Sequence, residues 1–173
     1  MWTNKKYLYN KINEFNKKNP GFICSPLPKF CESKGINLIA YNESNSHLIN
    51  ISKDGFSFLE DSEYSIFYNV NQQKPRQRFT IAHELGHIFL NHHNFLSPRL
   101  LRFGKNGLWE EQANIFARNI LIPADWEDYA STLSNYDAAF IFGVSQQMLS
   151  VRKKTFGEDK YWMDVCNDGR QCC

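Results

Sequence analysis

Apolar residues have two different spacings along the chain, and the spacing changes near Pro75. Upstream of Pro75, short apolar stretches are separated by the turn-forming sequences KDG and EDSE, which is typical of strands. Before these stretches, two segments have helical spacing, and the first carries Tyr7, Leu8, Ile12 and Phe15 on one side. We therefore expect helices at 4–17 and 27–34 and strands at 36–41, 47–52, 55–59 and 64–70.

Downstream of Pro75 the spacing becomes helical. Pro75 suits the first turn of a helix, and no breaker follows until about His93. Pro123 ends the next helical segment, and Gly143 divides the last one. These signals predict helices at 75–93 and 108–121, a third that begins at about 123, and two short ones within 136–157. The fold class is then α+β, with a small antiparallel sheet packed against the helix at 75–93 and further C-terminal helices.

The composition fits one globular domain. The chain has 173 residues, 42% of them apolar, and its net charge of +2 argues against a general polyanion binder. It shows no apolar leader and no run long enough to span a bilayer, so we expect a cytoplasmic protein. We expect a single domain over 1–157, of which 137–157 has helix-turn-helix spacing, followed by a tail at 158–173.

The five cysteines are odd in number and unevenly spaced, which favours reduced thiols over disulfides. Three of them, Cys166, Cys172 and Cys173, lie in the expected tail. A frayed terminus is the simplest interpretation of its end, CNDGRQCC at 166–173, and soft-metal binding, stray disulfides or prenylation are the alternatives.

The helix at 75–93 contains the sequence HELGH, formed by His83, Glu84 and His87 with two residues between. Residues four apart in a helix lie about 40° from each other around its axis, so the two imidazoles can converge on one metal ion. A catalytic zinc site usually has three protein ligands, and the zinc lowers the pKa of a bound water to about 7. Glu84 lies to one side of the pair, where a general base could take the proton of that water.

His92 and His93 complete a cluster of four histidines in this segment. On a continuous helix His92 falls roughly opposite the ligand face, and His93 lies about 120° from it. Neither could share a metal with His83 and His87 unless the helix ended before them. We therefore expect no catalytic role for either, beyond a favourable interaction with the helix dipole.

A third ligand is expected from the helix at 108–121, where Glu110 and Glu111 are the candidates. Helical spacing favours Glu110, because two small residues, Ala113 and Ala117, share its face and would allow close approach to another helix. Asn114 also lies on that face, so its amide could support a ligand imidazole from behind. Glu111 shares its face with other residues and fits the solvent edge.

Three motifs occur in a fixed order along the chain. They are RFTIAHELGHIFLNH at 78–92, EEQANIFARNILIP at 110–123 and FGVSQQMLSVR at 142–152. Together they resemble the ImmA/IrrE family of metallopeptidases, and the resemblance extends over roughly residues 25–157. Three motifs in order are far more specific than HELGH alone.

The resemblance implies a zincin-like fold and a zinc site with His83, His87 and Glu110 as ligands. It also implies Glu84 as general base and Asn114 as the residue behind a ligand. Characterised members are regulatory site-specific proteases that cut a helix-turn-helix repressor encoded nearby. This cleavage switches on genes of a phage, a mobile element or a stress response.

Peptide hydrolysis also needs a donor for the developing oxyanion and a place for the substrate chain. Tyr68 and His47 are the candidate oxyanion donors, and the sequence does not separate them. The substrate could add as a strand to an exposed sheet edge, for which YSIFYNV at 64–70 is the candidate.

Two other functions compete with the protease. The segment at 137–156 could be a DNA-binding helix-turn-helix, packed through Ala139 and Leu149, with Arg152, Lys153 and Lys154 meeting phosphates. The segment has few side chains suited to reading bases, which favours a role in packing or substrate docking instead. The chain could also act without metal as a binding partner, for instance in a toxin–antitoxin type of system.

Overall fold

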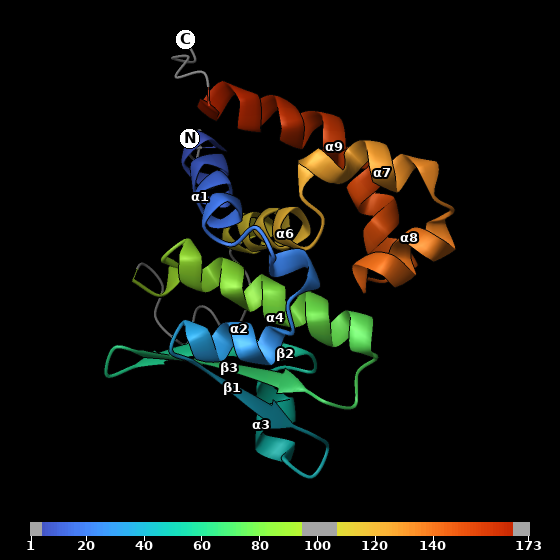
Figure 1. The fold of residues 1–173 in the computed structure, drawn as a ribbon. Coiled ribbons are helices and arrows are strands. Elements are labelled where there is room, and N and C mark those ends of the chain that lie inside the picture. Colours follow the sequence, from blue (N-terminus) through green and yellow to red (C-terminus); the bar gives the residue numbers. More distant parts are fainter. Residues whose placement is uncertain (1–4, 95–106, 168–173) are drawn as a thin grey trace. The chain divides into compact units, whose positions relative to one another are not determined.

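The computed structural model describes residues 5–94 and 107–167 (Figure 1). The chain divides into two compact units. We call residues 24–117 the central unit, and the segments before and after it, 5–23 and 118–167 as described, the terminal unit. The fold class is α+β, as the sequence predicted, with three strands among many helices. No helix in the described ranges is long and apolar enough to cross a membrane.

The central unit contains a mixed sheet of three strands: β1 (Ile36–Tyr41), β2 (Gly55–Glu60) and β3 (Glu63–Asn69). Strands β2 and β3 form an antiparallel hairpin, whose turn places Asp61 and Ser62 at positive φ. Strand β1 pairs with the other side of β3 in parallel. The expectation of a purely antiparallel sheet is therefore wrong for β1.

The strand order β1-β3-β2 puts β3 in the middle of the sheet. The segment YSIFYNV thus hydrogen-bonds to a neighbour on both sides, and its Ile66 is fully buried. The prediction that this segment offers a free edge to a substrate is wrong. Among the described strands, β1 and β2 form the edges.

The connection from β1 to β2 contains a short helix, α3 (Ser46–Ile51), at the position where a strand was expected. A parallel pair needs a crossover connection, and α3 lies within the one that leaves β1. None of its residues is buried, so its apolar positions at 48, 49 and 51 do not mark a sheet.

Helix α4 (Lys74–Phe89) packs on β2 and β3, and α2 (Leu27–Ser33) packs on β1. Pro75 lies in the first turn of α4, as expected. A short 3-10 turn, η1 (Phe22–Cys24), precedes α2, and another, η2 (His92–Asn94), follows α4. Helix α6 (Gly107–Leu121) begins in the central unit and ends in the terminal unit.

In the terminal unit, α1 (Lys5–Lys18) packs on the long helix α9 (Gln146–Asn167). Leu8, Ile12 and Phe15 form its buried face as predicted, but Tyr9 replaces Tyr7, which is exposed. A 3-10 turn, η3 (Ala124–Trp126), leads into the shorter helices α7 (Glu127–Thr132) and α8 (Asn135–Phe142), and all three pack on α9.

Helices α8 and α9 meet at Gly143, which has a φ of 63°, a conformation that suits glycine. Ala139 and Leu149 are buried on the two sides of this turn, as helix-turn-helix spacing predicted. Arg152, however, is fully buried and paired with Asp159, so it cannot contact a phosphate. This burial removes one of the three basic residues on which the DNA-binding alternative depended.

The last helix was expected to end at Gly157, but α9 continues through this residue to Asn167. Phe156, Asp159 and Val165 are buried along it, so residues 158–167, which were expected to belong to a tail, continue the helix. Cys166 is half-buried, whereas Cys172 and Cys173 lie outside the described residues. A single domain over 1–157 stays a prediction.

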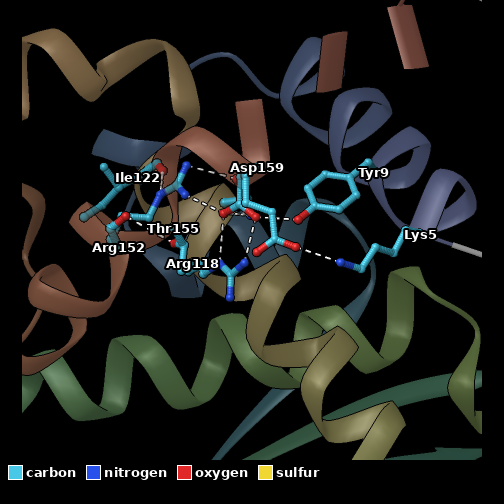
Figure 2. Close-up of polar contacts among 9 residues, drawn as sticks. Lys5, Tyr9, Arg118, Ile122, Arg152, Thr155 and Asp159 are labelled. Atoms are coloured by element: carbon cyan, nitrogen blue, oxygen red, sulfur yellow. Dashed lines mark hydrogen bonds and ion pairs between the residues drawn. The ribbon is translucent and has the colours of Figure 1, made fainter. Parts of the chain in front are cut away.

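Asp159 is the centre of a buried polar cluster, which we call the Asp159 cluster (Figure 2). Its carboxylate accepts two hydrogen bonds from Arg118, at 2.9 and 2.7 Å, and one from Arg152, at 2.6 Å. The Tyr9 hydroxyl and the Asn119 amide donate to it as well. Burial raises the pKa of the carboxyl, but the hydrogen bonds and charges of these partners outweigh it and hold the pKa below its ordinary value.

Candidate metal centre

Helix α4 places His83 and His87 one turn apart, and their Nε2 atoms lie 3.1 Å from each other. Glu84, between them in the sequence, is buried and lines the same cavity as both histidines. The four-residue spacing therefore has the geometric effect that the sequence predicted.

Glu110, in the first turn of α6, faces the two imidazoles. One of its carboxylate oxygens lies 3.1 Å from His83 Nε2, and the other lies 3.5 Å from His87 Nε2. The ligand atoms of the three residues all lie within 4.8 Å of one another. Glu110 is thus the carboxylate that the structure brings to the pair, whereas Glu111 is exposed.

The separations among these atoms fit a tetrahedral metal ion. Zinc bonds to nitrogen and oxygen of about 2.0–2.1 Å require neighbouring ligand atoms to lie about 3.3–3.4 Å apart. The two imidazole nitrogens lie 3.1 Å apart, and each lies 3.1 or 3.5 Å from a different oxygen of Glu110, so these separations are of the size that a bound metal requires. The donor set, two imidazole nitrogens and one carboxylate, is also the set that zinc uses in catalytic sites.

Helices α4 and α6 approach closely at Gly86. A Cβ added to Gly86 would lie 3.1 Å from both Cα and O of Ala113 and 3.3 Å from Cβ of Phe116. Ala113 is fully buried, and so is Ala117, the second small residue on this face of α6. The small side chains that the sequence pointed to are thus buried, and Ala113 lies at the contact that brings Glu110 to the histidines.

Ser57, on β2, holds the carboxylate of Glu84. Its hydroxyl donates a hydrogen bond of 2.6 Å to Glu84 Oε2, and both residues are buried. The Nε2 atom of His93 lies 3.0 Å from the same Ser57 oxygen. Ser57 was not singled out at the level of sequence, although this serine is the one polar residue between two phenylalanines of a predicted strand.

Each imidazole of the pair also has a partner on its other nitrogen. Asn114 Oδ1 lies 3.0 Å from His83 Nδ1, which fits the supporting role expected of Asn114. His92 Nδ1 lies 2.9 Å from His87 Nδ1, and His92 Nε2 lies 3.2 Å from Gln112 Oε1. His92 and Gln112 were both missed at the level of sequence.

The reason for missing His92 is the end of helix α4. The helix stops at Phe89, and Asn91 adopts a φ of 57°, so the chain turns back into η2. Asparagine tolerates this left-handed conformation and often follows a helix end. The expectation that His92 and His93 point away from the site held only for a continuous helix and is wrong.

The setting of this site shifts the pKa values of His83, His87 and Glu84. Burial lowers the pKa of His83, but its hydrogen bond to Glu110 and the charges of Glu84 and Glu110 outweigh this, so the pKa is raised. Burial, with the charges of the neighbouring histidines, lowers the pKa of His87 to about 2. Burial raises the pKa of Glu84, although His83 and Ser57 oppose the shift. His87 is therefore neutral near pH 7, which is the form that binds a metal.

A cavity of about 350 Å³ opens at these residues and follows β2. Gly55, Phe56 and Ser57 all line it, and since neighbours in a strand point to opposite faces, the cavity follows the edge of the strand. Arg76 and Asp54 also line it, joined by two hydrogen bonds of 2.7 Å.

The candidate oxyanion donors are not placed at this cavity. Tyr68 is half-buried on β3, and His47 is exposed on α3, and neither residue lines the cavity. The roles suggested for them stay predictions.

A helix that presents two histidines and a glutamate, faced by a carboxylate from a second helix, is the arrangement of a metallopeptidase. The comparison with protein families agrees with this class. Residues 31–154 match the peptidase family described as the IrrE N-terminal-like domain, and the chain belongs to this ImmA/IrrE family. Comparison with curated proteins and with solved structures finds no significant match.

Proposed function

We propose that this protein is a zinc-dependent endopeptidase. The observation that carries the proposal is the convergence of His83, His87 and Glu110, whose ligand atoms lie within 4.8 Å of one another. These three residues would hold the zinc ion. When bound, zinc supplies a Lewis acid for the scissile carbonyl and for the attacking water.

Glu84 is the general base of the proposed reaction. Ser57 holds this carboxylate through its hydroxyl, which donates to Oε2, and through its main chain, so that the carboxylate is oriented to take a proton from the attacking water and to pass it to the leaving amine nitrogen. Its burial supports this role, because a raised pKa brings a carboxylate closer to the pH at which it must both accept and release a proton.

The substrate chain lies along the edge of β2. Residues of this edge strand line the cavity, and an extended peptide can pair with an edge strand as an added strand. Arg76 lies two turns before His83 on α4, about 10 Å along the helix. The ion pair of Arg76 and Asp54 would then meet substrate residues some distance from the scissile bond.

The proposed substrate is a helix-turn-helix repressor encoded close to this gene, and such a substrate places the enzyme in the cytoplasm. Membership of the ImmA/IrrE family supports this choice.

The test combines metal analysis with cleavage of the neighbouring repressor. The purified chain should contain about one zinc per molecule and should cut the repressor at a defined site. Glu84→Gln should retain the zinc and lose cleavage, whereas Glu111→Gln, an exposed change on the same helix as Glu110, should cut normally. Absence of metal, or cleavage by Glu84→Gln at the normal rate, would overturn the proposal.

A further inference from the structure

Three side chains contact one another in a series that starts at His87 and leads away from the proposed metal site. His87 Nδ1 contacts His92 Nδ1 at 2.9 Å, and His92 Nε2 contacts Gln112 Oε1 at 3.2 Å. The three residues come from α4, η2 and α6, so the chain of contacts links both helices that supply ligands.

The order of atoms in this series of contacts determines which ring nitrogen of His92 and of His87 carries a hydrogen. An amide oxygen can only accept, so His92 Nε2 carries the hydrogen that is donated to Gln112. A neutral imidazole has one N–H, which leaves His92 Nδ1 as an acceptor. The hydrogen between the two rings is then on His87 Nδ1, and His87 Nε2 keeps its lone pair. This nitrogen is the one that faces His83 and Glu110.

The opposite orientation of the amide would reverse every step. If Gln112 presented its NH2 group to His92, His92 Nδ1 would donate to His87 Nδ1, and the hydrogen of His87 would move to Nε2. A protonated Nε2 has no lone pair for a metal. The group that Gln112 presents therefore favours one tautomer of His87, and only the tautomer with its hydrogen on Nδ1 can bind a metal through Nε2.

His92 is held in place by the packing of its ring. It is fully buried, and its ring packs against the rings of Trp109 and His87, with centroid separations of 4.5 and 5.0 Å. In contrast, the other ligand imidazole, His83, contacts the amide oxygen of Asn114 directly. His87 thus depends on an intermediate ring for the support that His83 receives in one step.

We propose that His92 is a positioning residue for the metal site. Together with Gln112 it fixes the tautomer and ring orientation of His87, so that Nε2 is presented to the metal. The inference rests on the proposed function, since it takes His87 as a metal ligand.

The decisive measurement is the dissociation constant for zinc, obtained by competition with a chelator. His92→Phe keeps an aromatic ring against Trp109 but removes both hydrogen bonds, and we expect it to weaken zinc binding about 10–100-fold. Gln112→Leu, at a half-buried position, should weaken binding in the same direction by a smaller factor. Gln112→Glu keeps an acceptor and should bind zinc at least as tightly as the wild type.

Two controls separate this role from a loss of folding. Glu111→Gln, the exposed neighbour of Gln112, should leave zinc affinity within about twofold of the wild type. Thermal unfolding of each metal-free variant should show that the chain is still folded. If His92→Phe does not fold, the comparison of Gln112→Leu with Gln112→Glu carries the test.

Long-range proton–nitrogen NMR spectra of the metal-free chain read the tautomers directly. We expect His92 to carry its hydrogen on Nε2 and His87 to carry its hydrogen on Nδ1. Hydrogen on His92 Nδ1, or unchanged zinc affinity in His92→Phe and Gln112→Leu, would overturn the inference. A wild-type chain that binds no zinc would overturn the proposed function instead, and the tautomers would still be tested.

Discussion

Two buried polar clusters, one in each unit, differ in how their hydrogen-bond donors and acceptors are matched. In the Asp159 cluster, the carboxylate meets donors on every side, and its charge faces two guanidinium groups (Figure 2). In the candidate metal centre, His83, His87 and Glu110 turn acceptor atoms toward one common point. Acceptors that face each other repel unless a proton or a metal cation joins them. The Asp159 cluster, whose carboxylate is matched by donors, is a closed cluster and stabilises the fold. The metal centre, whose acceptors face one another, is an open cluster and creates an affinity for a cation.

A substitution of Glu84 should distinguish the two clusters most clearly, because it should change activity and not stability. Glu84→Gln should lower kcat of repressor cleavage about 10²–10⁴-fold, because it removes the general base. Zinc affinity and the thermal unfolding temperature should stay close to those of the wild type, since a glutamine can still accept from Ser57. A kcat close to the wild-type value would show that Glu84 is not the general base.

Asp159→Asn tests the closed cluster. It leaves Arg118 and Arg152 without their balancing charge in a buried setting, and we expect a loss of about 3–5 kcal/mol in the free energy of unfolding. Denaturant titration measures this loss. The matched control is Glu158→Gln at the preceding position, where the exposed ion pair with Lys5 should contribute less than about 1 kcal/mol. Equal effects of the two changes would contradict the central role of Asp159.

Gly86→Ala tests how the open cluster depends on the approach of its helices. The added Cβ would meet the main chain of Ala113 at 3.1 Å, and we expect a cost of about 1–3 kcal/mol in stability. Zinc affinity should also fall, although no ligand has changed, because Glu110 moves with α6. Gly107→Ala is the control, since its Cβ would meet nothing within 4 Å. Zinc titration of both variants decides the question.

The smallest expected effect is the pH dependence of the Asp159 cluster. Because the pKa of Asp159 is lower in the folded chain than its ordinary value of 3.8, the unfolded chain binds a proton first as the pH falls. The stability that Asp159 contributes is therefore complete above about pH 3.8 and decreases below it toward the folded pKa. Asp159→Asn should show a flatter decline in this range, measured by unfolding at stepwise lower pH. An unchanged slope would mean that other carboxyl groups carry the acid sensitivity.

The sequence was sufficient where a signal is local and periodic. The spacing of His83 and His87 and the helical face shared by Glu110 and Asn114 follow from 3.6 residues per turn, and the structure brings these residues together. The small side chain of Ala113 likewise indicated a close helix contact.

The sequence was insufficient where the outcome depends on distant partners. The pattern of β3 shows a strand, but its central position depends on which strands pair with it. Gly157 reads as a helix end, yet burial of Phe156 and Asp159 on either side outweighs the cost of about 1 kcal/mol for glycine inside a helix. The turn at Asn91 is local, but asparagine only permits the left-handed conformation, so the return of His92 could not be deduced from it.

Helix α6 carries three of the groups at the metal centre within five residues: Glu110, Gln112 and Asn114. Substitutions change one of these groups at a time and leave the others in register. A one-residue insertion or deletion between Glu110 and Asn114 would instead rotate the following groups by about 100° relative to Glu110. We therefore expect a change of length between Glu110 and Asn114 to disturb the supports of both ligand imidazoles at once, which no single substitution at Gln112 or Asn114 would do.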